Sequence, residues 1–533
     1  MAGDQQVVKL RETLRALGFA LVGESADSDG VKTRLALREF QAYARIARTA
    51  KLKAGTASAR WIERLEPVDN TFHPPFPPIT GELDAAGNTQ RALDHWVAQT
   101  YRCPLVIEAR VIGASDFQPL LANVWDYGDP GFVIVQTAVK KKTGKTPSFE
   151  FRVADFTRTT SPATAWELMP LVGSREPGFG WGGKPRRSAP PALTLECTPK
   201  TALAKDWFAL SAEQQVTFRV IRAVAEQECI GFFDALNSYD TAIMSMGPCH
   251  WTMTLRLTGK DGSTIGELPP FLAYAIGREP NLQMQEFDPF GLQPQYAWPP
   301  GTAGQLYKGS WEETRNYTGR MSWTTNSGRV PIEKYSELNW FRTPHWYWRF
   351  VEMARRHPVL LTSEWDMARV RLRDLLTTKV GGSGTYKDRQ LSEIFTSPLA
   401  CALVLRFHIR SSGFAAPIND YPSQIIARAG VTGTPSTWED SQEKLLIDSL
   451  IAHAVRRSYP VSTIPRPDMG QKPTLAELLE HGKTVEKRLG IHKDALAMQA
   501  WPDKDVFEVA GLPLGSRCAG RTQQQTQRLQ EGL

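Results

Sequence analysis

The alternation of apolar and polar residues at the start of the chain predicts two amphipathic helices joined by a polar turn. Between residues 7 and 47, apolar side chains recur every three or four positions, which is the spacing of one helix face. The first face ends at Gly18, and the polar stretch 24–30 separates it from the second. The apolar positions are Val7, Leu10, Leu14 and Leu17 on the first helix and Leu35, Leu37, Phe40 and Ile46 on the second.

Farther along, the hydrophobic pattern changes period and so indicates how the chain is organised. Strand-like runs, LVIEARVIG and GFVIVQTAV, occur within residues 101–160, and a stretch rich in Gly and Pro follows at 173–192. Helical periodicity dominates from about 200 to 460. We therefore expect an α+β protein that is predominantly α. Its predicted parts are a helical domain at 1–100, a β-containing connector at 101–200, a second α+β domain at 201–465 and a C-terminal extension at 466–533.

The segment 215–255 combines a predicted helix with a predicted hairpin. After Gly231 a polar connection that contains Asp240 leads to the alternating run TAIMSMG, and CHWTMTLRLTG continues the strand character. The pattern predicts a helix that ends in a carboxylate, followed by a small hairpin that presents a second one. The helix face consists of Phe218, Ile221, Val224 and Ala225 and runs into Glu226 and Glu228.

Two carboxyl groups in this layout suit the hydrolysis of a glycosidic bond. One carboxylic acid protonates the leaving oxygen, while a second carboxylate activates water or stabilises the oxocarbenium-like transition state. Glu228, beside Cys229 and Phe232, has the apolar neighbours that favour a proton donor. Asp240, within the polar run Asn-Ser-Tyr-Asp, suits the ionised partner. Glu226 is the alternative acid, and Glu228 is preferred because it lies nearer the hairpin.

Aromatic and basic residues farther along allow two interpretations. The segment 339–358 is rich in aromatic residues, and Trp346 or Trp348 could line a sugar subsite, although helical spacing favours packing in the core. Arginines at 369, 371 and 373 either hold anionic groups of a substrate or pair with Glu364, Asp366 and Asp374. The apolar helix expected at 397–413 has His408 as a core residue.

Composition excludes several other chemistries. The chain has no CxxC and no HExxH motif, and the GKT at 144–146 lacks the upstream glycine of a P-loop, so we expect no metal, nucleotide or other cofactor. The formal charge of +7 is small for 533 residues, and no nucleic-acid motif accompanies it, so nucleic acid is not an expected partner. Cys229 and Cys249 either pair after export or remain buried thiols.

The first residues carry charges where a signal peptide needs an apolar stretch, and no run of eighteen apolar residues occurs. We therefore expect synthesis in the cytoplasm without an ordinary export signal, and no transmembrane segment.

The N-terminal pattern resembles the peptidoglycan-binding domain. In that family a helix ending in Leu-Gly-aromatic is followed by an Asp-Gly turn and then by T-x-x-A-[LV]-x-x-[FY]-Q. Here the motif stands as Leu17-Gly18-Phe19, Asp29-Gly30, and Thr33, Ala36, Leu37 and Phe40-Gln41. A second echo follows at Asp84, Gly87, Thr89, Ala92 and Trp96. A helical adaptor for an unknown partner is the alternative interpretation of this region.

The segment 228–251 resembles the catalytic signature of phage-type lysozymes and, more closely, a lysozyme-like group that follows peptidoglycan-binding domains in lysins. The resemblance assigns Glu228 as general acid, Asp240 as second carboxylate and Ser245 as a water-positioning hydroxyl. Three features depart from the family pattern: the Glu-to-Asp interval is longer, Cys229 replaces a glycine, and His250 replaces a glutamine. The matching residues are Asp234-Ala235, Asn237 through Asp240, Ser245, Gly247, His250 and Trp251.

Together the two resemblances imply a muramidase that cleaves the β-1,4 bond between the amino sugars of peptidoglycan. A lytic transglycosylase acting on the same bond and an inactive wall-binding structural protein are the alternatives. The implied site of action is the cell wall of a target bacterium, in the periplasm or outside. Delivery by a secretion machine or a phage tail, and an immunity protein as partner, fit this interpretation. Candidate substrate contacts are Asn237, Tyr239, Trp251 and Trp346.

Overall fold

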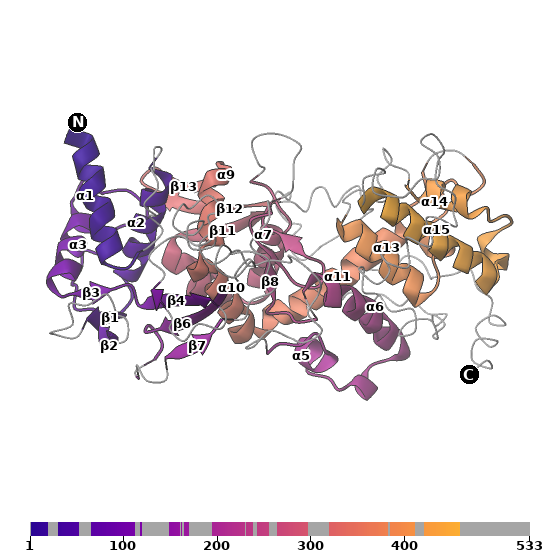
Figure 1. Cartoon of the computed structure of the whole chain (residues 1–533), viewed down its shortest axis with the longest axis horizontal. Coiled ribbons are helices and arrows are strands. Elements are labelled where there is room, and N and C mark those ends of the chain that lie inside the picture. Colours follow the sequence, from indigo (N-terminus) through magenta and orange to yellow (C-terminus); the bar gives the residue numbers. More distant parts are fainter. Residues whose placement is uncertain are drawn as a thin grey trace.

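The computed structural model shows a mixed α and β protein, about 52% helical, with small antiparallel sheets. This agrees with the α+β class predicted from the sequence. The N-terminal elements lie at one end of the molecule and the helices α13–α15 at the other (Figure 1). The structure describes residues 2–19, 30–52, 65–111, 118–119, 149–159, 161, 165–169, 194–229, 231–237, 242–254, 264–296, 319–381, 384–410 and 421–458.

Three helices form the N-terminal bundle: α1 (Ala2–Ala16), α2 (Val31–Tyr43) and α3 (Asn88–Ala98). Helices α2 and α3 each begin directly after a glycine in the left-handed region, Gly30 at φ 67° and Gly87 at φ 72°. Glycine adopts this conformation without the steric cost that a Cβ atom brings. The helices of the two motif echoes therefore start in the same way, from a glycine in the left-handed region. The α1 and α2 helices confirm the two that were predicted for residues 7–47.

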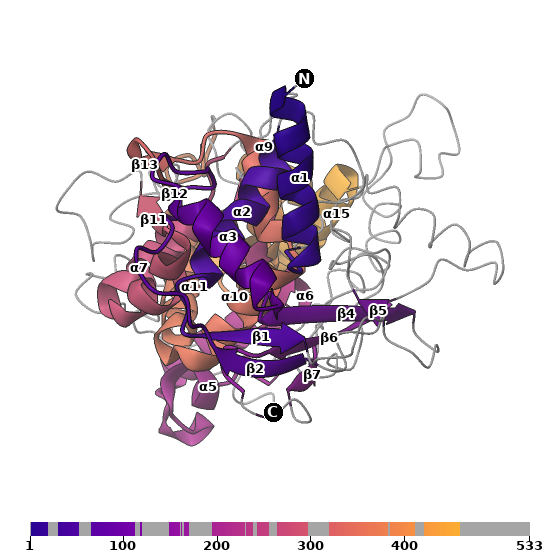
Figure 2. The same ribbon diagram turned by 90° about the vertical axis from the view of Figure 1, so that its left-hand side faces the viewer.

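Aromatic rings fill the centre of this bundle. Phe40 packs edge-on against Phe19 at 5.6 Å and against Trp96 at 5.3 Å between ring centroids. Figure 2 shows the three helices above a small sheet of order β2-β1-β3. Its strands are β1 (Arg48–Leu52), β2 (Leu65–Asp69) and β3 (Tyr101–Arg102).

A four-stranded antiparallel sheet of order β5-β4-β6-β7 follows the bundle. Its longest pairing joins β4 to β6, with Leu105 opposite Asp155 and Val111 opposite Phe149. Strand β4 confirms the first strand predicted for this region, whereas the second predicted run, at 131–139, lies outside the described residues. The strands are β4 (Leu105–Val111), β5 (Gln118–Pro119), β6 (Phe149–Asp155) and β7 (Trp166–Leu168).

The middle of the chain supplies the elements around the candidate site. They are α5 (Pro199–Leu203), η3 (Trp207–Ala209), α6 (Ala212–Glu228), β8 (Leu236–Asn237), β9 (Ser245–Met246), β10 (Trp251–Thr252) and α7 (Leu268–Arg278). A π-helical turn η4 (Gln283–Phe287), η5 (Asp288–Phe290) and a sheet of β11 (Leu292–Tyr296), β12 (Gly319–Thr325) and β13 (Gly328–Pro331) follow.

The remaining described elements are helical. They are α9 (Tyr335–Leu338), η7 (Asn339–Arg342), α10 (Pro344–Arg356), α11 (Pro358–Thr377), α12 (Leu391–Ile394), α13 (Pro398–Arg410), α14 (Tyr421–Ala429), η8 (Pro435–Thr437) and α15 (Asp440–Ser458). No described helix is long and apolar enough to cross a membrane.

One hydrophobic core extends through most of these elements, from Leu14 in α1 to Leu450 in α15. The bundle and the middle of the chain are further joined by a buried ion pair between Glu39 of α2 and Arg349 of α10, at 2.7 Å. The described part of the chain is therefore packed continuously across the predicted boundary at residue 100. The domain boundaries themselves stay a prediction, and the extension at 466–533 lies outside the described residues.

The corner between α10 and α11 carries a histidine held by two carboxylates. His357 is buried, with Nε2 2.9 Å from Glu286 and Nδ1 3.0 Å from Glu279. The hydrogen bond to Glu286, with help from Glu279, raises the pKa of His357 above its ordinary value. This corner connects α10, whose Arg349 pairs with Glu39 of the bundle, to α11.

The raised pKa of His357 predicts that stability falls as the pH rises. In the folded protein, protonated His357 binds two carboxylates that it does not bind in the unfolded chain. Its contribution to the free energy of unfolding is therefore complete below about pH 6.5 and is lost as the pH rises through the raised pKa. Urea unfolding at about pH 6 and about pH 8.5 measures this loss. The variant His357→Gln is expected to lose less stability over that interval than the wild type. His73→Gln, which changes an exposed histidine, serves as the control; an unchanged pH dependence in His357→Gln contradicts the prediction.

Candidate active site

Helix α6 ends at Glu228, as the sequence predicted. The helix starts with a capping box in which Ser211 and Gln214 satisfy each other's backbone N–H groups. Its apolar face is buried, so tertiary packing fixes the direction in which the helix ends. Cys229 leaves the helical conformation at φ −136° and ψ 26°, and Gly231 follows in the left-handed region. Glu228 is thereby held at the end of the helix with only 8% of its surface exposed.

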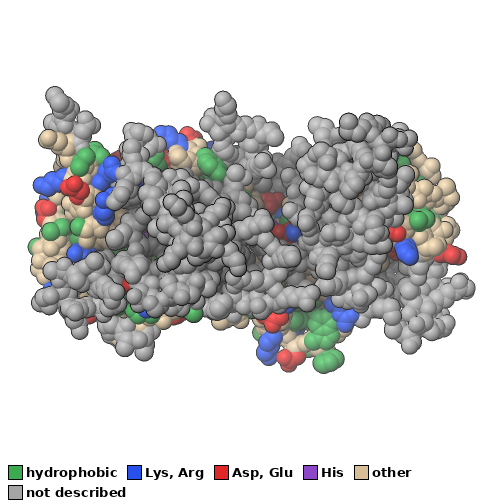
Figure 3. All heavy atoms as spheres, viewed as in Figure 1, with side chains coloured by type: hydrophobic (Ala, Val, Ile, Leu, Met, Phe, Trp, Pro, Cys, Tyr) green, Lys and Arg blue, Asp and Glu red, His purple; other side chains and the backbone are tan. Residues whose placement is uncertain are grey.

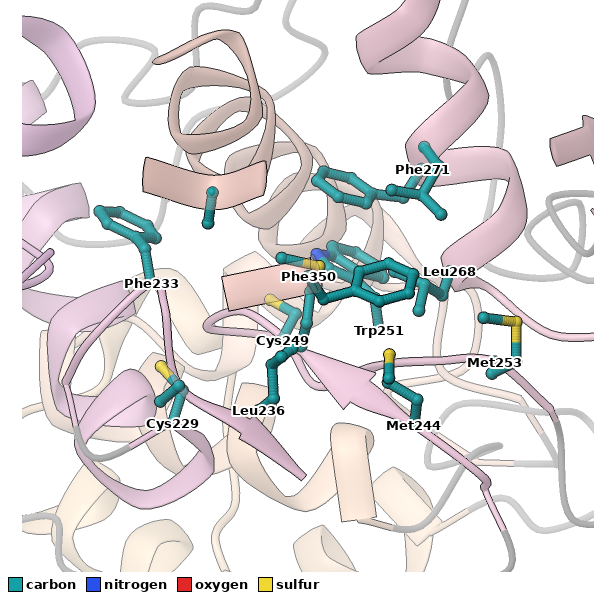
Figure 4. Packing of buried hydrophobic residues seen from close by; sticks show 14 of the residues in the cluster. Cys229, Phe233, Leu236, Met244, Cys249, Trp251, Met253, Leu268, Phe271 and Phe350 are labelled. Atoms are coloured by element: carbon teal, nitrogen blue, oxygen red, sulfur yellow. The ribbon is translucent and has the colours of Figure 1, made fainter. Parts of the chain in front are cut away.

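A three-stranded antiparallel sheet, β10-β9-β8, stands next to this helix end, where the sequence predicted a hairpin. Its apolar row consists of Leu236, Met246 and Trp251, which pair across the strands and are buried. Figure 4 shows Leu236 and Trp251 among the packed core side chains, with Phe271 above Trp251. The neighbouring register positions carry polar residues, Asn237, Ser245 and Thr252. One row thus anchors the sheet in the core and the next row supplies polar groups.

The tight turn between β9 and β10 directs His250 toward Glu228. Gly247 and His250 both have positive φ, at 77° and 55°, and the His250 N–H donates to the Gly247 carbonyl at 2.9 Å. As a result, Nδ1 of His250 lies 3.3 Å from Oε2 of Glu228. The role of His250 was open in the sequence; the structure makes it a direct neighbour of the candidate acid.

Arg406, which lies far from Glu228 in the sequence, contacts the same carboxyl group. It comes from α13, which packs against α6, and its Nη1 forms an ion pair with Oε1 of Glu228. The Arg406 side chain is 6% exposed. Sequence reasoning missed this residue. The available signal was that Arg406 directly follows the wholly apolar run 398–405 of α13, because a buried guanidinium needs an anionic partner.

Arg371 of α11 fixes the turn that carries His250. Its guanidinium donates to the Cys249 carbonyl at 3.3 Å and to Glu267 at 3.1 Å, and it lies over the Trp251 ring at 5.1 Å. This corrects the pairing suggested by the sequence, where Glu364 was a partner for these arginines. Among the described residues Glu364 has no hydrogen-bond partner for either carboxyl oxygen.

Glu364 is instead buried directly behind the turn. A Cβ atom placed on Gly247 would come 2.8 Å from Oε2 of Glu364, so only glycine fits at this point of the turn. Burial raises the pKa of the Glu364 carboxyl well above its ordinary value, with Cys229 and Asp234 contributing. At 0% exposure Glu364 supports the hairpin from within the core and cannot meet a substrate.

The other predicted site residues have different outcomes. Ser245 is 1% exposed and its hydroxyl has no partner among the described residues. Trp251 and Trp346 are both in the core; Trp346 packs against Trp340 at 5.3 Å and Phe341 at 5.1 Å. Neither ring has an exposed face for a sugar, which corrects the expectation that Trp251 and Trp346 contact the substrate. Likewise His408 is fully buried in α13, where burial lowers its pKa.

Several predicted residues fall where the structure gives no description. Asp240 and Tyr239 lie outside the described residues, and the side chains of Glu226 and Asn237 are not described. Asn237 is placed only by its register, opposite Ser245. Within the described part of the chain, no group of three His, Cys, Asp or Glu side chains could hold a metal ion. The space-filling view shows acidic and basic side chains together in a hollow near the middle of the molecule (Figure 3).

Comparisons with models of protein families, with curated proteins and with solved structures find no match for this chain. The resemblances to peptidoglycan-binding domains and to phage-type lysozymes therefore rest on the motif residues quoted above. What the structure adds to them is the geometry around Glu228.

Proposed function

We propose that this chain is a peptidoglycan glycoside hydrolase in which Glu228 is the general acid. The observation that carries the proposal is the position of Glu228: a buried carboxyl at the end of α6, with His250 of the hairpin turn on one oxygen and Arg406 of α13 on the other. Three separate elements converge on one carboxyl group. Fixing the donor in this way is what general acid catalysis requires, because the acid must meet the leaving oxygen in one orientation.

In the proposed reaction, Glu228 is ionised in its ion pair with Arg406, and the proton that reaches the glycosidic oxygen comes from protonated His250 through Glu228 as the bond to the sugar's anomeric carbon breaks. Arg406 keeps the carboxyl group in place during this transfer. Asp240 is the proposed second carboxylate, which activates water or stabilises the positive charge on the sugar. Ser245 has a buried hydroxyl with no described partner, which supports its proposed role of positioning water.

The substrate class rests on the N-terminal motif together with the hydrolase motif. Both segments resemble parts of proteins that act on bacterial cell walls. Left-handed glycines, Gly30 and Gly87, precede α2 and α3 in the two N-terminal echoes, and Phe40 of the first echo packs on Trp96 of the second. We further propose that the protein acts on the wall of a target bacterium and reaches it through a secretion machine or a phage tail.

Digestion of purified sacculi tests the proposal. The wild-type protein is incubated with sacculi, and the soluble fragments are analysed by mass spectrometry. Fragments with reducing amino-sugar ends support a hydrolase, whereas 1,6-anhydro ends support a lytic transglycosylase. If the protein sediments with the sacculi but releases no fragments, the enzymatic proposal is wrong and a wall-binding structural role takes its place.

A further inference from the structure

The backbone of His250 adopts a conformation that a histidine reaches only at a cost. Its φ of 55° lies in the left-handed region, where the Cβ atom of any residue other than glycine is crowded. Such a conformation persists where the surrounding structure fixes it. His250 stands between Cys249 in the turn and Trp251 at the start of β10. The groups that hold these two neighbours therefore decide where the His250 imidazole points.

Arg371 of α11 holds the residues on both sides of His250. On one side its Nη1 donates to the Cys249 carbonyl at 3.3 Å, and on the other its guanidinium lies 5.1 Å from the centre of the Trp251 ring. The Trp251 ring is itself fixed, because it stacks on Phe271 of α7 with the two rings 7° from parallel (Figure 4). Arg371 thus connects the turn to a packed part of the core.

An ion pair fixes the Arg371 side chain in turn. Its Nη1 lies 3.1 Å from Oε2 of Glu267, the residue directly before α7, and α7 packs against α11. The Arg371 side chain is 3% exposed and that of Glu267 18%, so water screens the pair little. A planar guanidinium can hold a carbonyl, a carboxylate and a ring face at once, whereas an ammonium group has no such planar fork.

The same face of α11 meets the turn at a second point. Glu364 precedes Arg371 by seven residues, which is about two turns of an α-helix, so both side chains project from one face. The Glu364 carboxyl group lies against Gly247, where an added Cβ atom would come 2.8 Å from Oε2. The turn 247–250 therefore rests on α11 at both ends, on Glu364 at Gly247 and on Arg371 at Cys249.

This support is noncovalent. Cys229 directly follows α6 and Cys249 lies in the turn, and the sequence left open whether the two pair. In the structure both are free and buried. No disulfide between them ties the turn to the end of α6, so the contacts from α11 remain as its support.

We propose that Arg371 is a positioning residue: by holding Cys249 and Trp251, it keeps the His250 imidazole in contact with the Glu228 carboxyl group. Arg371 acts through His250 and not on the substrate, since its side chain is buried. Without Arg371 the turn can relax from its left-handed conformation, and Glu228 loses the imidazole from which its proton comes. The catalytic consequence rests on the proposed function, whereas the hold of Arg371 on His250 does not.

Modification of histidines by diethyl pyrocarbonate tests this hold without using activity. Full-length wild type, Arg371→Met and Arg369→Met are treated alike, and peptide mapping by mass spectrometry gives the rate for each histidine. Arg369→Met is the matched control, because it makes the same change on the same helix at an arginine that pairs with Asp366. We expect His250 to react faster in Arg371→Met alone. His453, buried in α15, should stay protected in every variant and so reports an intact fold.

Kinetics on soluble, uncrosslinked glycan strands test the catalytic consequence. Displacing a proton donor is expected to lower kcat of Arg371→Met by about 10²-fold, with KM unchanged. Arg371→Lys keeps the charge without the planar fork and should recover part of kcat. Glu267→Gln weakens the anchor of Arg371 and should change both the kcat and the His250 modification rate in the same direction, by less.

The proposal is wrong if His250 reacts at the wild-type rate in a folded Arg371→Met protein. It is equally wrong if His250 reacts faster but kcat stays at the wild-type value. If reaction of His453 shows that Arg371→Met does not fold, Glu267→Gln decides in its place. A wild type that cleaves no glycan overturns the proposed function, and the modification rates then decide by themselves whether Arg371 holds His250.

Discussion

Replacing Glu228 with glutamine is expected to lower the release of fragments from sacculi by about 10²–10⁴-fold, which is the range that a positioned general acid contributes. Glutamine keeps the size of the side chain and can still accept a hydrogen bond, but it cannot transfer a proton to the glycosidic oxygen. The measurement is the initial rate of appearance of amino-sugar ends from purified sacculi, with the concentration of folded protein determined independently.

The variant requires a check on folding, because Glu228 also neutralises the buried Arg406. Removing the charge is expected to lower the melting temperature, so the assays are run well below it. Glu333→Gln makes the same chemical change at a side chain that is 74% exposed, and it should keep the wild-type rate. Asp240→Asn tests the second proposed carboxylate. Should Glu226→Gln abolish fragment release while Glu228→Gln retains it, the assignment of the acid is wrong.

Local pattern was sufficient to place Glu228 and the hairpin. The end of α6 could be predicted because its apolar face stops at Ala225 and Gly231 follows soon after. The hairpin could be predicted because apolar and polar residues alternate after Gly231. These are interactions between residues close in sequence. Arg406 reaches Glu228 only because α13 packs against α6, and a single sequence carries no record of that long-range contact beyond the oddity of an arginine in an apolar helix.

For the buried tryptophans, the sequence allowed a functional role that long-range packing rules out. The many aromatic residues at 339–358 were compatible with a sugar subsite as well as with a core, because the sequence does not reveal which rings face solvent. The structure places Trp346 at 0% exposure, because rings from η7 and from α10 itself surround it. From its spacing along α11, Glu364 was expected to pair with an arginine of the same helix. The turn at Gly247 instead covers the Glu364 carboxyl group, which has no hydrogen-bond partner among the described residues.

Replacing Arg349 with leucine is expected to destabilise the whole described core, and this is the largest effect on stability that we predict. Arg349 donates two hydrogen bonds to the Glu39 carboxylate, at 2.8 and 2.7 Å, and a third to the Tyr43 hydroxyl at 2.8 Å. The Trp340 indole donates to Glu39 at 2.7 Å. Without Arg349 a carboxylate remains buried and uncompensated, which costs about 3–5 kcal/mol. For a single transition of a 533-residue chain, we expect the melting temperature to fall by about 3–5 °C.

A matched surface pair provides the control. Arg389→Leu removes an arginine that lies just before α12 and pairs with Glu393 near the surface, where such a pair contributes roughly 0.5 kcal/mol or less. The double variant Glu39→Leu with Arg349→Leu should be more stable than Arg349→Leu alone, because it removes the stranded carboxylate. A double variant no more stable than the single one would show that lost packing, and not the buried charge, causes the destabilisation.

The pH dependence of stability separates the electrostatic contribution of the Glu39–Arg349 pair from its packing contribution. Burial alone would raise the pKa of Glu39, but the charge and hydrogen bonds of Arg349 outweigh it and the pKa is lowered. Because its pKa is lowered in the folded protein, Glu39 contributes stability at pH values above its ordinary pKa of 4.5. This stability is lost as the pH falls through the pKa of Glu39 in the folded protein. The difference in stability between wild type and Arg349→Leu, measured by urea unfolding, should therefore narrow in acid.

The Arg349 result also bears on how the N-terminal bundle works. A wall-binding module on a flexible linker would melt independently of the middle of the chain, and Arg349→Leu would then leave the bundle's transition unchanged. The continuous core and the buried Glu39–Arg349 pair favour a single transition in which the bundle and the candidate site unfold together. In that case the bundle fixes α10 relative to the rest of the protein, and removing residues 1–100 to isolate the proposed catalytic domain should yield an unstable protein.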